Sequence, residues 1–136
     1  MNATEPRVAK LVIEGLCKRY GATTALDPSS LSVAEGEFLT LLGPSGSGKT
    51  TLLQLICGLV EASEGKVVID GRDQSAMPVH QRDIGLVFQH YALFPHLTVA
   101  ENIAFPLKMR GRPSAEVAGR VSAALDMVHL GHLAGR

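Results

Sequence analysis

The pattern G-x-x-x-x-G-K-[ST] is typical of a phosphate-binding loop, and it occurs here as Gly43-Pro44-Ser45-Gly46-Ser47-Gly48-Lys49-Thr50. The glycines permit backbone conformations in which successive N–H groups point inward at phosphate oxygens. Lys49 offers a positive charge to the β- and γ-phosphates, and Thr50 offers a hydroxyl to Mg²⁺. With Thr51 counted among the binding residues, the pattern predicts a site for a nucleoside triphosphate with magnesium.

Such a loop needs a strand before it and a helix after it, and the flanking residues favour both. Residues 37–42 are nearly continuously apolar, which predicts a strand buried on both faces, as in a parallel sheet. A helix is expected over about 48–58, with Gly58 near its C-terminal end. Its apolar residues at helical spacing are Leu52, Leu55, Ile56 and Leu59. The helix dipole would add to the attraction for phosphate.

The remaining pattern is a mixture of strands and helices. Further strands are expected over 10–16, 31–34, 67–69 and 84–88, with turns at Glu35-Gly36 and Asp70-Gly71. Pro28 falls where an antiparallel edge strand should run, a position that tolerates proline.

Two features predict helices in the C-terminal part. Thr98 and Glu101 have the spacing of a capping box. A second helix is expected over 113–130, with an apolar face formed by Val117, Val121, Leu125 and Val128.

Three segments together resemble the ATP-binding subunit of an ABC transporter. They are Arg19-Tyr20-Gly21, the loop region Gly43–Leu53, and the run from Val87 to Ile103. Within the last, Phe-Pro-His-Leu-Thr-Val-Ala-Glu-Asn-Ile is similar to bacterial import ATPases of the polyamine, iron(III), sulfate and sugar type.

The resemblance implies an α/β fold of the P-loop NTPase kind. It would have a parallel core sheet, an N-terminal antiparallel β subdomain and the start of a helical subdomain at 90–136. Residues 1–136 would form a partial nucleotide-binding domain with ATP and Mg²⁺ as cofactors.

The same resemblance implies roles for individual residues. Tyr20 would stack on adenine, and Gln89 would reach Mg²⁺ and the attacking water. Lys49 and Gln89 would then be the catalytic residues, and Thr50 and Gln89 the metal ligands. The alternatives are an ordinary tyrosine at a strand end and an ordinary polar residue after a strand.

The resemblance also implies partners. A second ATPase subunit would pair head to tail, and the apolar segment Tyr91–Leu97 would face the transmembrane permease subunits. The alternative for this segment is packing beneath the chain's own helical subdomain, and both can hold at once.

Composition excludes several other classes of function. The 13 basic and 13 acidic residues balance, and Trp is absent, so a nucleic-acid partner is not expected. Cys17 and Cys57 predict small buried residues rather than a disulfide. A metal cluster is not expected either, because no recognised ligand spacing connects His80, His90, His96, His129 and His132. The sequence shows no signal peptide and no apolar run of membrane length, so we expect a cytoplasmic protein. The resemblance implies that it is peripheral on the cytoplasmic face of the inner membrane.

The family's signature Leu-Ser-Gly-Gly-Gln is not in the sequence, and neither is an apolar strand ending in Asp-Glu. We therefore expect an N-terminal fragment of an importer ATPase that couples ATP hydrolysis to solute uptake in its full-length form. The alternative is a truncated nucleotide-binding module or remnant without turnover. Another P-loop class, such as a small kinase or GTPase, is a further alternative, and a GTPase is disfavoured because no guanine-reading Asn-Lys-x-Asp is present.

Overall fold

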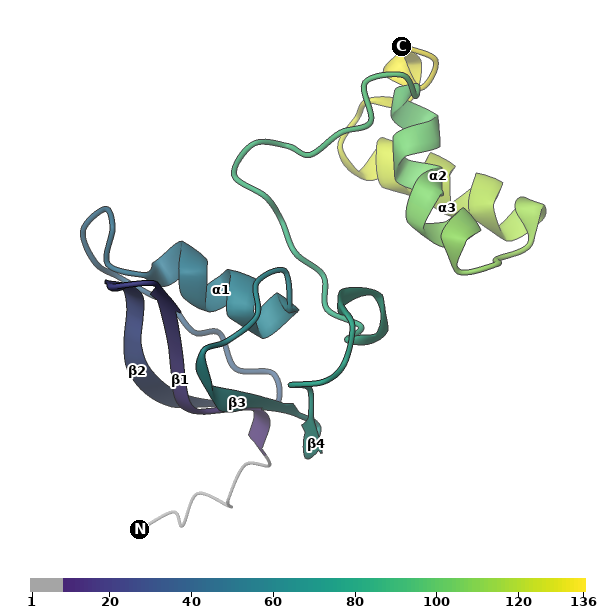
Figure 1. Cartoon of the computed structure of the whole chain (residues 1–136). Coiled ribbons are helices and arrows are strands. Elements are labelled where there is room, and N and C mark those ends of the chain that lie inside the picture. Colours follow the sequence, from purple (N-terminus) through teal and green to yellow (C-terminus); the bar gives the residue numbers. More distant parts are fainter. Residues whose placement is uncertain (1–8) are drawn as a thin grey trace, which may run out of the picture. The chain divides into compact units, whose positions relative to one another are not determined.

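The computed structural model describes residues 9–136. These residues divide into two compact units, and the boundary lies between Leu86 and Val87. The first unit combines a small sheet with one helix, and the second is a pair of helices (Figure 1). Each unit has its own apolar core.

The sheet of the first unit is antiparallel throughout. Its strands are β1 (Ala9–Tyr20), β2 (Thr23–Ala34), β3 (Glu64–Ile69) and β4 (Arg72–Asp73), in the order β2-β1-β3-β4. The expected strands at 10–16, 31–34 and 67–69 are confirmed, and each observed strand is longer. β2 lies at an edge of the sheet, which is a position that tolerates Pro28.

The β3–β4 hairpin confirms the turn expected at Asp70-Gly71. Both residues have positive φ angles, 50° and 72°, as a two-residue type I′ turn requires. Asp70 also pairs with Lys10 of β1 at 2.7 Å. The turn therefore closes the hairpin and ties it to the neighbouring strand.

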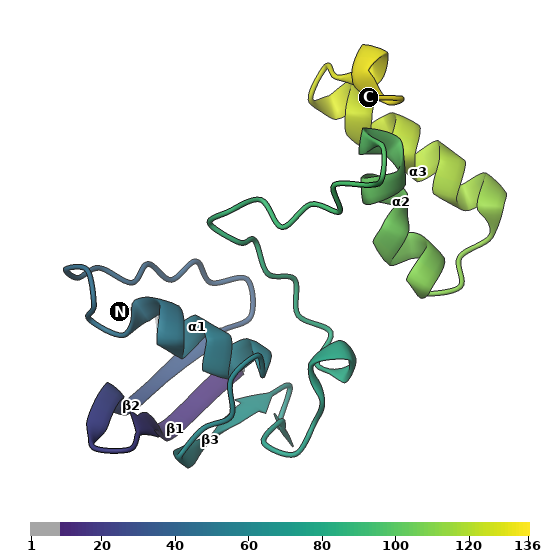
Figure 2. The same ribbon diagram turned by 45° about the horizontal axis from the view of Figure 1, so that its top comes forward.

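Helix α1 (Lys49–Cys57) lies across one face of this sheet (Figure 2). The core between them is apolar and consists of Ile13, Leu16, Leu26, Leu52, Leu55 and Val67. The expected inward positions Leu52 and Leu55 are confirmed, but Leu59 is exposed because the helix ends before it. Cys17 and Cys57 are buried and unpaired, as expected, and burial raises the pKa of the Cys57 thiol.

The C-terminal end of α1 is closed by Gly58 and Arg82. Gly58 adopts a left-handed conformation (φ 77°), and its N–H donates to carbonyl groups of the last turn. The Arg82 guanidinium donates to the carbonyl oxygens of Leu55 at 3.1 Å and Ile56 at 2.9 Å. A cation here also opposes the negative end of the helix dipole. Arg82 follows the short 3-10 turn η1 (Val79–Gln81).

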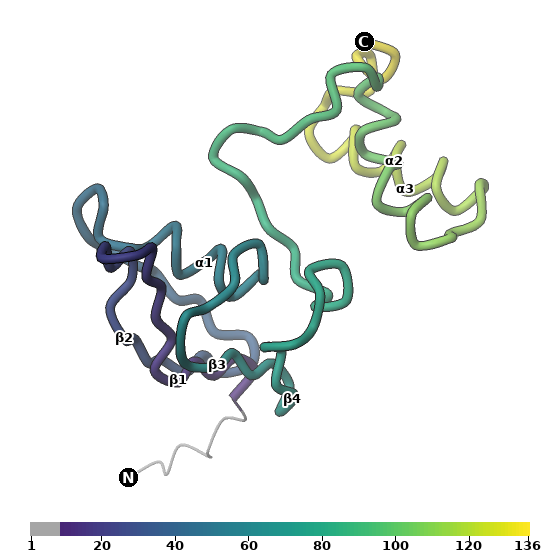
Figure 3. Tube along the Cα trace, in the orientation of Figure 1, coloured from purple at the N-terminus to yellow at the C-terminus, as the bar shows by residue number. Residues whose placement is uncertain are grey.

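Two expected strands of the parallel core sheet are not formed. Residues 37–42 and 84–88 have no strand pairing within the described chain, and Phe38 and Val87 are 92% and 96% exposed. The Glu35-Gly36 turn does form, through a bond from Glu37 N–H to the Ala34 carbonyl, but no strand follows it. Figure 3 shows the trace running from the end of β2 to α1 without regular structure. The apolar pattern indicated that these segments suit burial, but a strand also needs a neighbour for its backbone groups.

The second unit is built from α2 (Val99–Met109), α3 (Ser114–Met127) and the 3-10 turn η2 (Gly131–Leu133). Its core contains Ala104, Val117, Val121 and Leu125. Three of the four expected apolar positions on α3 are therefore confirmed. Val128 is the exception, because it lies at the C-cap and is exposed.

The capping box at the start of α2 is confirmed. The Thr98 hydroxyl accepts from Glu101 N–H at 3.2 Å, and the Glu101 carboxylate accepts from Thr98 N–H at 2.8 Å. These bonds, above all the one from the Thr98 backbone, lower the pKa of the Glu101 carboxyl. The Glu101 side chain, in its charged form, thus stabilises the start of α2.

Replacing Gly58 by alanine should lower the stability of the first unit by about 2 kcal/mol. The new Cβ would be forced into a left-handed conformation and would lie 2.5 Å from the Arg82 guanidinium. Urea denaturation followed by circular dichroism measures the change. Gly85→Ala is the control, because Gly85 has open space around it and no left-handed φ. Equal stability of the two variants would contradict the role of Gly58.

The capping box should also make the second unit sensitive to acid. A carboxyl whose pKa is lowered on folding contributes stability above its unfolded pKa, about 4.3 for glutamate, and loses it as pH falls through the folded pKa. Glu101→Gln keeps an oxygen acceptor but cannot titrate, so its helix content should fall less steeply below about pH 4. An acid titration followed at 222 nm tests this, with Ser114→Ala as the control because it caps no helix. An unchanged acid slope in Glu101→Gln would refute it.

Candidate functional site

The glycine-rich loop leads directly into α1. Gly46 and Gly48 have positive φ angles of 81° and 88°, and Gly48 is the N-cap of the helix. The Ser47 N–H donates to the Pro44 carbonyl at 3.3 Å, which makes the loop turn back on itself. The predicted loop-to-helix arrangement is therefore confirmed.

The Lys49 side chain folds back into this turn. Its Nζ donates to the carbonyl oxygens of Gly43 at 2.9 Å and Pro44 at 2.7 Å, and to the Ser47 hydroxyl at 2.8 Å. An ammonium group has three donors, so an incoming anion must draw Nζ from at least one of these acceptors. All three acceptors are uncharged, which leaves the positive charge without an anionic partner among them.

Glycine is needed at both ends of the loop because other atoms approach closely. A Cβ on Gly43 would lie 2.7 Å from the Ser47 hydroxyl oxygen. A Cβ on Gly48 would lie 2.9 Å from Cδ1 of Leu26 and 3.2 Å from the carbonyl oxygen of Ala25. The second approach seats the end of the loop against β2.

The start of α1 offers what an anion needs. It has no side-chain cap and no acidic residue in its first turn, so its first N–H groups and its dipole are not neutralised by a side chain. Helix α2 differs, because its start carries the capping box and Glu101. With Lys49 alongside and the hydroxyls of Thr50 and Thr51 in the first turn, the donor set fits a phosphate chain.

Tyr20 lies close to the loop along the sheet. It is the last residue of β1, is 55% exposed, and pairs with Thr23 across the hairpin. Two residues earlier, Lys18 lies opposite Leu26, which is the residue that approaches Gly48. The antiparallel register therefore brings the expected adenine residue and the phosphate loop to the same end of β1 and β2.

Gln89 lies in the second unit, in a turn, and is exposed. The segment before it was expected to be a strand and is irregular. The loop from Gly43 to Thr50 belongs to the first unit. The predicted role of Gln89 at the metal therefore stays a prediction.

The segment Tyr91–Leu97 exposes part of its apolar surface. Tyr91 is 88% exposed and Leu93 is exposed as well, whereas the Phe94 ring lies 4.4 Å from that of Phe105 on α2. Packing on the chain's own helix, the alternative considered from the sequence, therefore applies to Phe94. Tyr91 remains available to a partner.

Asn102 holds this segment in place and was not foreseen. Its side chain accepts from Phe94 N–H at 2.9 Å and donates to carbonyl groups of Phe94, Leu97 and Thr98 at 3.0–3.2 Å. A single asparagine inside a helix carries no sequence signal for such contacts. Only its spacing of four residues from Thr98 hinted at the bond to the Thr98 carbonyl.

Comparison with known proteins gives a consistent result. A family model described as ABC transporter matches residues 26–136. The spermidine/putrescine import ATP-binding protein PotA of Nitrosospira multiformis is 49% identical over 95% of this chain and 36% of its own length. The Fe(3+) ions import ATP-binding protein FbpC of Escherichia coli K12 is 49% identical over 87% and 34%. The sulfate/thiosulfate import ATP-binding protein CysA 1 of Chromobacterium violaceum is 52% identical over 91% and 36%.

Among solved structures, the dimeric post-hydrolysis state of the ATP-binding cassette MJ0796, bound to ADP and Pi, superposes with a TM-score of 0.81. The match is 32% identical and covers 93% of this chain and 60% of that one. The chain thus spans about a third of the length of the curated relatives it matches. Within residues 9–136, no helix combines the length and apolar character that crossing a bilayer requires.

Proposed function

The chain belongs to the ABC transporter family of ATP-binding domains, and we propose that it binds Mg-ATP as part of the ATPase component of a bacterial import system. In the whole protein, hydrolysis of ATP would be coupled to uptake of a solute. The import ATP-binding proteins among its relatives support this reading. Residues 1–136 would be part of the nucleotide-binding domain, with 90–136 as the start of its helical subdomain.

One observation carries the proposal: the uncapped start of α1 and the Lys49 ammonium meet at a loop in which Lys49 contacts uncharged acceptors. Among residues 9–136, Lys49 donates to Gly43, Pro44 and Ser47. A triphosphate bound there would exchange neutral acceptors for charged oxygens, and charge-assisted hydrogen bonds are about twice as strong. The loop is thus built to bind phosphate rather than to stabilise the protein by itself.

Each site residue then has a physical task. Lys49 neutralises charge on the β- and γ-phosphates, and Thr50 orients its hydroxyl toward Mg²⁺. Tyr20 presents an aromatic face to adenine. Gln89 would orient the water that attacks the γ-phosphorus, while the bond to the β-phosphate oxygen breaks and ADP and phosphate leave. Mg²⁺ would supply charge neutralisation at the phosphate oxygens.

The proposed partners follow from the exposed surfaces and from the relatives. Tyr91 and Leu93 present apolar area that a permease subunit could cover. The dimeric state of the MJ0796 cassette supports a second ATPase subunit, and we propose that the two pair head to tail. The permease contact would place the protein on the cytoplasmic face of the inner membrane.

A second candidate function is nucleotide binding without turnover by the 136-residue chain. The sequence contains neither Leu-Ser-Gly-Gly-Gln nor an apolar strand ending in Asp-Glu. Hydrolysis needs activation of the attacking water as well as charge neutralisation. Lys49 and Thr50 address charge neutralisation and Gln89 would orient the water, but the carboxylate of an Asp-Glu strand that would activate the water is not in this sequence.

Lys49→Ala should weaken Mg-ATP binding at least tenfold, because a charge-assisted contact to two phosphates is lost. Isothermal titration calorimetry of the chain measures it. Lys66→Ala is the matched control, since Lys66 pairs with Glu14 on the sheet and takes no part in the loop. Equal affinities for wild type and Lys49→Ala would show that the loop is not the nucleotide site.

Phosphate release separates the two candidate functions. The 136-residue chain should bind Mg-ATP but release no phosphate above the background of its Lys49→Ala variant. A colorimetric phosphate assay at saturating Mg-ATP is the measurement. Magnesium-dependent release that Lys49→Ala abolishes would reject the reading without turnover and favour the ATPase.

A further inference from the structure

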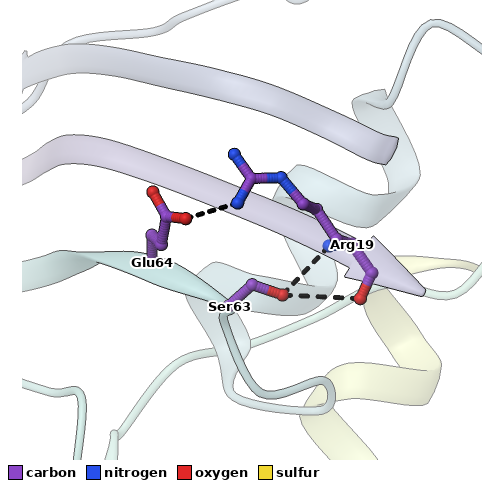
Figure 4. Close-up of polar contacts among 3 residues, drawn as sticks. All are labelled: Arg19, Ser63 and Glu64. Atoms are coloured by element: carbon purple, nitrogen blue, oxygen red, sulfur yellow. Dashed lines mark hydrogen bonds and ion pairs between the residues drawn. The ribbon is translucent and has the colours of Figure 1, made fainter. Parts of the chain in front are cut away.

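The end of β1 is held by side chains where its pairing with β3 stops. The last pair between these strands is Cys17 with Glu64. Beyond it, Arg19 N–H donates to the Ser63 hydroxyl at 3.0 Å, and the same hydroxyl lies 3.4 Å from the Arg19 carbonyl, to which it donates (Figure 4). One serine therefore satisfies both backbone groups of the residue before Tyr20.

Figure 4 also shows a second link, the ion pair between Arg19 and Glu64. Both side chains are about half exposed. Exposed pairs of this kind contribute little to stability because water competes for both charges. On the side that faces β3, the backbone contact of Ser63, rather than the ion pair, therefore constrains this strand end, while pairing with β2 holds the other side.

Lys18 provides a contact to the Tyr20 ring itself. Its Nζ lies 4.8 Å from the ring centroid and donates to the Glu61 carbonyl at 2.6 Å. Residues two apart on a strand share one face of the sheet, so the ammonium is well placed over the ring. Lys18 thus connects the ring to the same connecting segment, between α1 and β3, that contains Ser63.

We propose that Ser63 and Lys18 are positioning residues for Tyr20 and set the contribution of base stacking to nucleotide affinity. Ser63 fixes the backbone before the ring, and Lys18 contacts the ring, while the residue as a whole remains 55% exposed. A ring held before binding loses less freedom when the base arrives. The inference rests on the proposed binding of Mg-ATP.

The test compares two ligands, Mg-ATP and magnesium tripolyphosphate, which share a phosphate chain but not a base. The quantity measured is the ratio of their affinities for each variant of the chain. Tyr20→Ala should lower this ratio about 5- to 100-fold, the range for loss of one base stack. Ser63→Ala and Lys18→Met should each lower it about 2- to 10-fold, with tripolyphosphate affinity unchanged.

The ratio is insensitive to folding, because an unfolded fraction lowers both apparent affinities by the same factor. Ser63→Thr retains a hydroxyl and should restore the ratio. Glu64→Gln removes only the exposed ion pair and should leave it at the wild-type value.

The outcomes distinguish a failure of this inference from a failure of the proposed nucleotide binding. If the wild type binds neither ligand, or Tyr20→Ala leaves the ratio unchanged, the proposed adenine site and the inference both fail. If Tyr20→Ala lowers the ratio while Ser63→Ala and Lys18→Met do not, nucleotide binding stands and the positioning role is overturned. A ratio for Ser63→Thr as low as that for Ser63→Ala would also count against the hydroxyl contact.

Discussion

The close approach of Gly48 to β2 is the constraint on which the rest of the first unit depends. Gly48 has a φ of 88°, and a Cβ at this position would lie 3.2 Å from the carbonyl oxygen of Ala25 on β2, so the approach of the loop to the sheet favours glycine. Its left-handed conformation also sets the direction in which α1 leaves the loop. The helix then packs Leu52 and Leu55 onto the sheet. The proposed anion site and the core of the first unit are thus formed by the same helix.

The two ends of α1 are treated in opposite ways. Its N-terminal end has neither a side-chain cap nor an acidic residue, whereas its C-terminal end is covered by Gly58 and by the Arg82 guanidinium. Neutralising the negative end of the dipole leaves the positive end to act on a ligand. Arg82 comes shortly before the segment that leads toward Gln89, so one residue links this segment to helix α1.

The second unit shows a comparable division of tasks. Its core is small, and the capping box with Asn102 fixes the backbone at the start of α2. The exposed apolar side chains of Tyr91 and Leu93 directly precede Phe94, whose backbone Asn102 holds through two hydrogen bonds. Apolar area presented in this way suits a partner surface better than a flexible tail would, because less freedom is lost on binding.

The sequence alone determined the features that depend on neighbouring residues. The loop from Gly43 to Thr50, the left-handed end of α1 at Gly58, the Asp70-Gly71 turn and the capping box at Thr98 all follow from local backbone chemistry. Tertiary structure decided what depends on distant partners. Within residues 9–136, the segments 37–42 and 84–88 form no strand pairing. Ser63 and the Glu61 carbonyl meet the end of β1 that carries Lys18 and Tyr20. Hydrogen bonds between residues more than forty positions apart leave no periodic pattern, so only the folded chain reveals them.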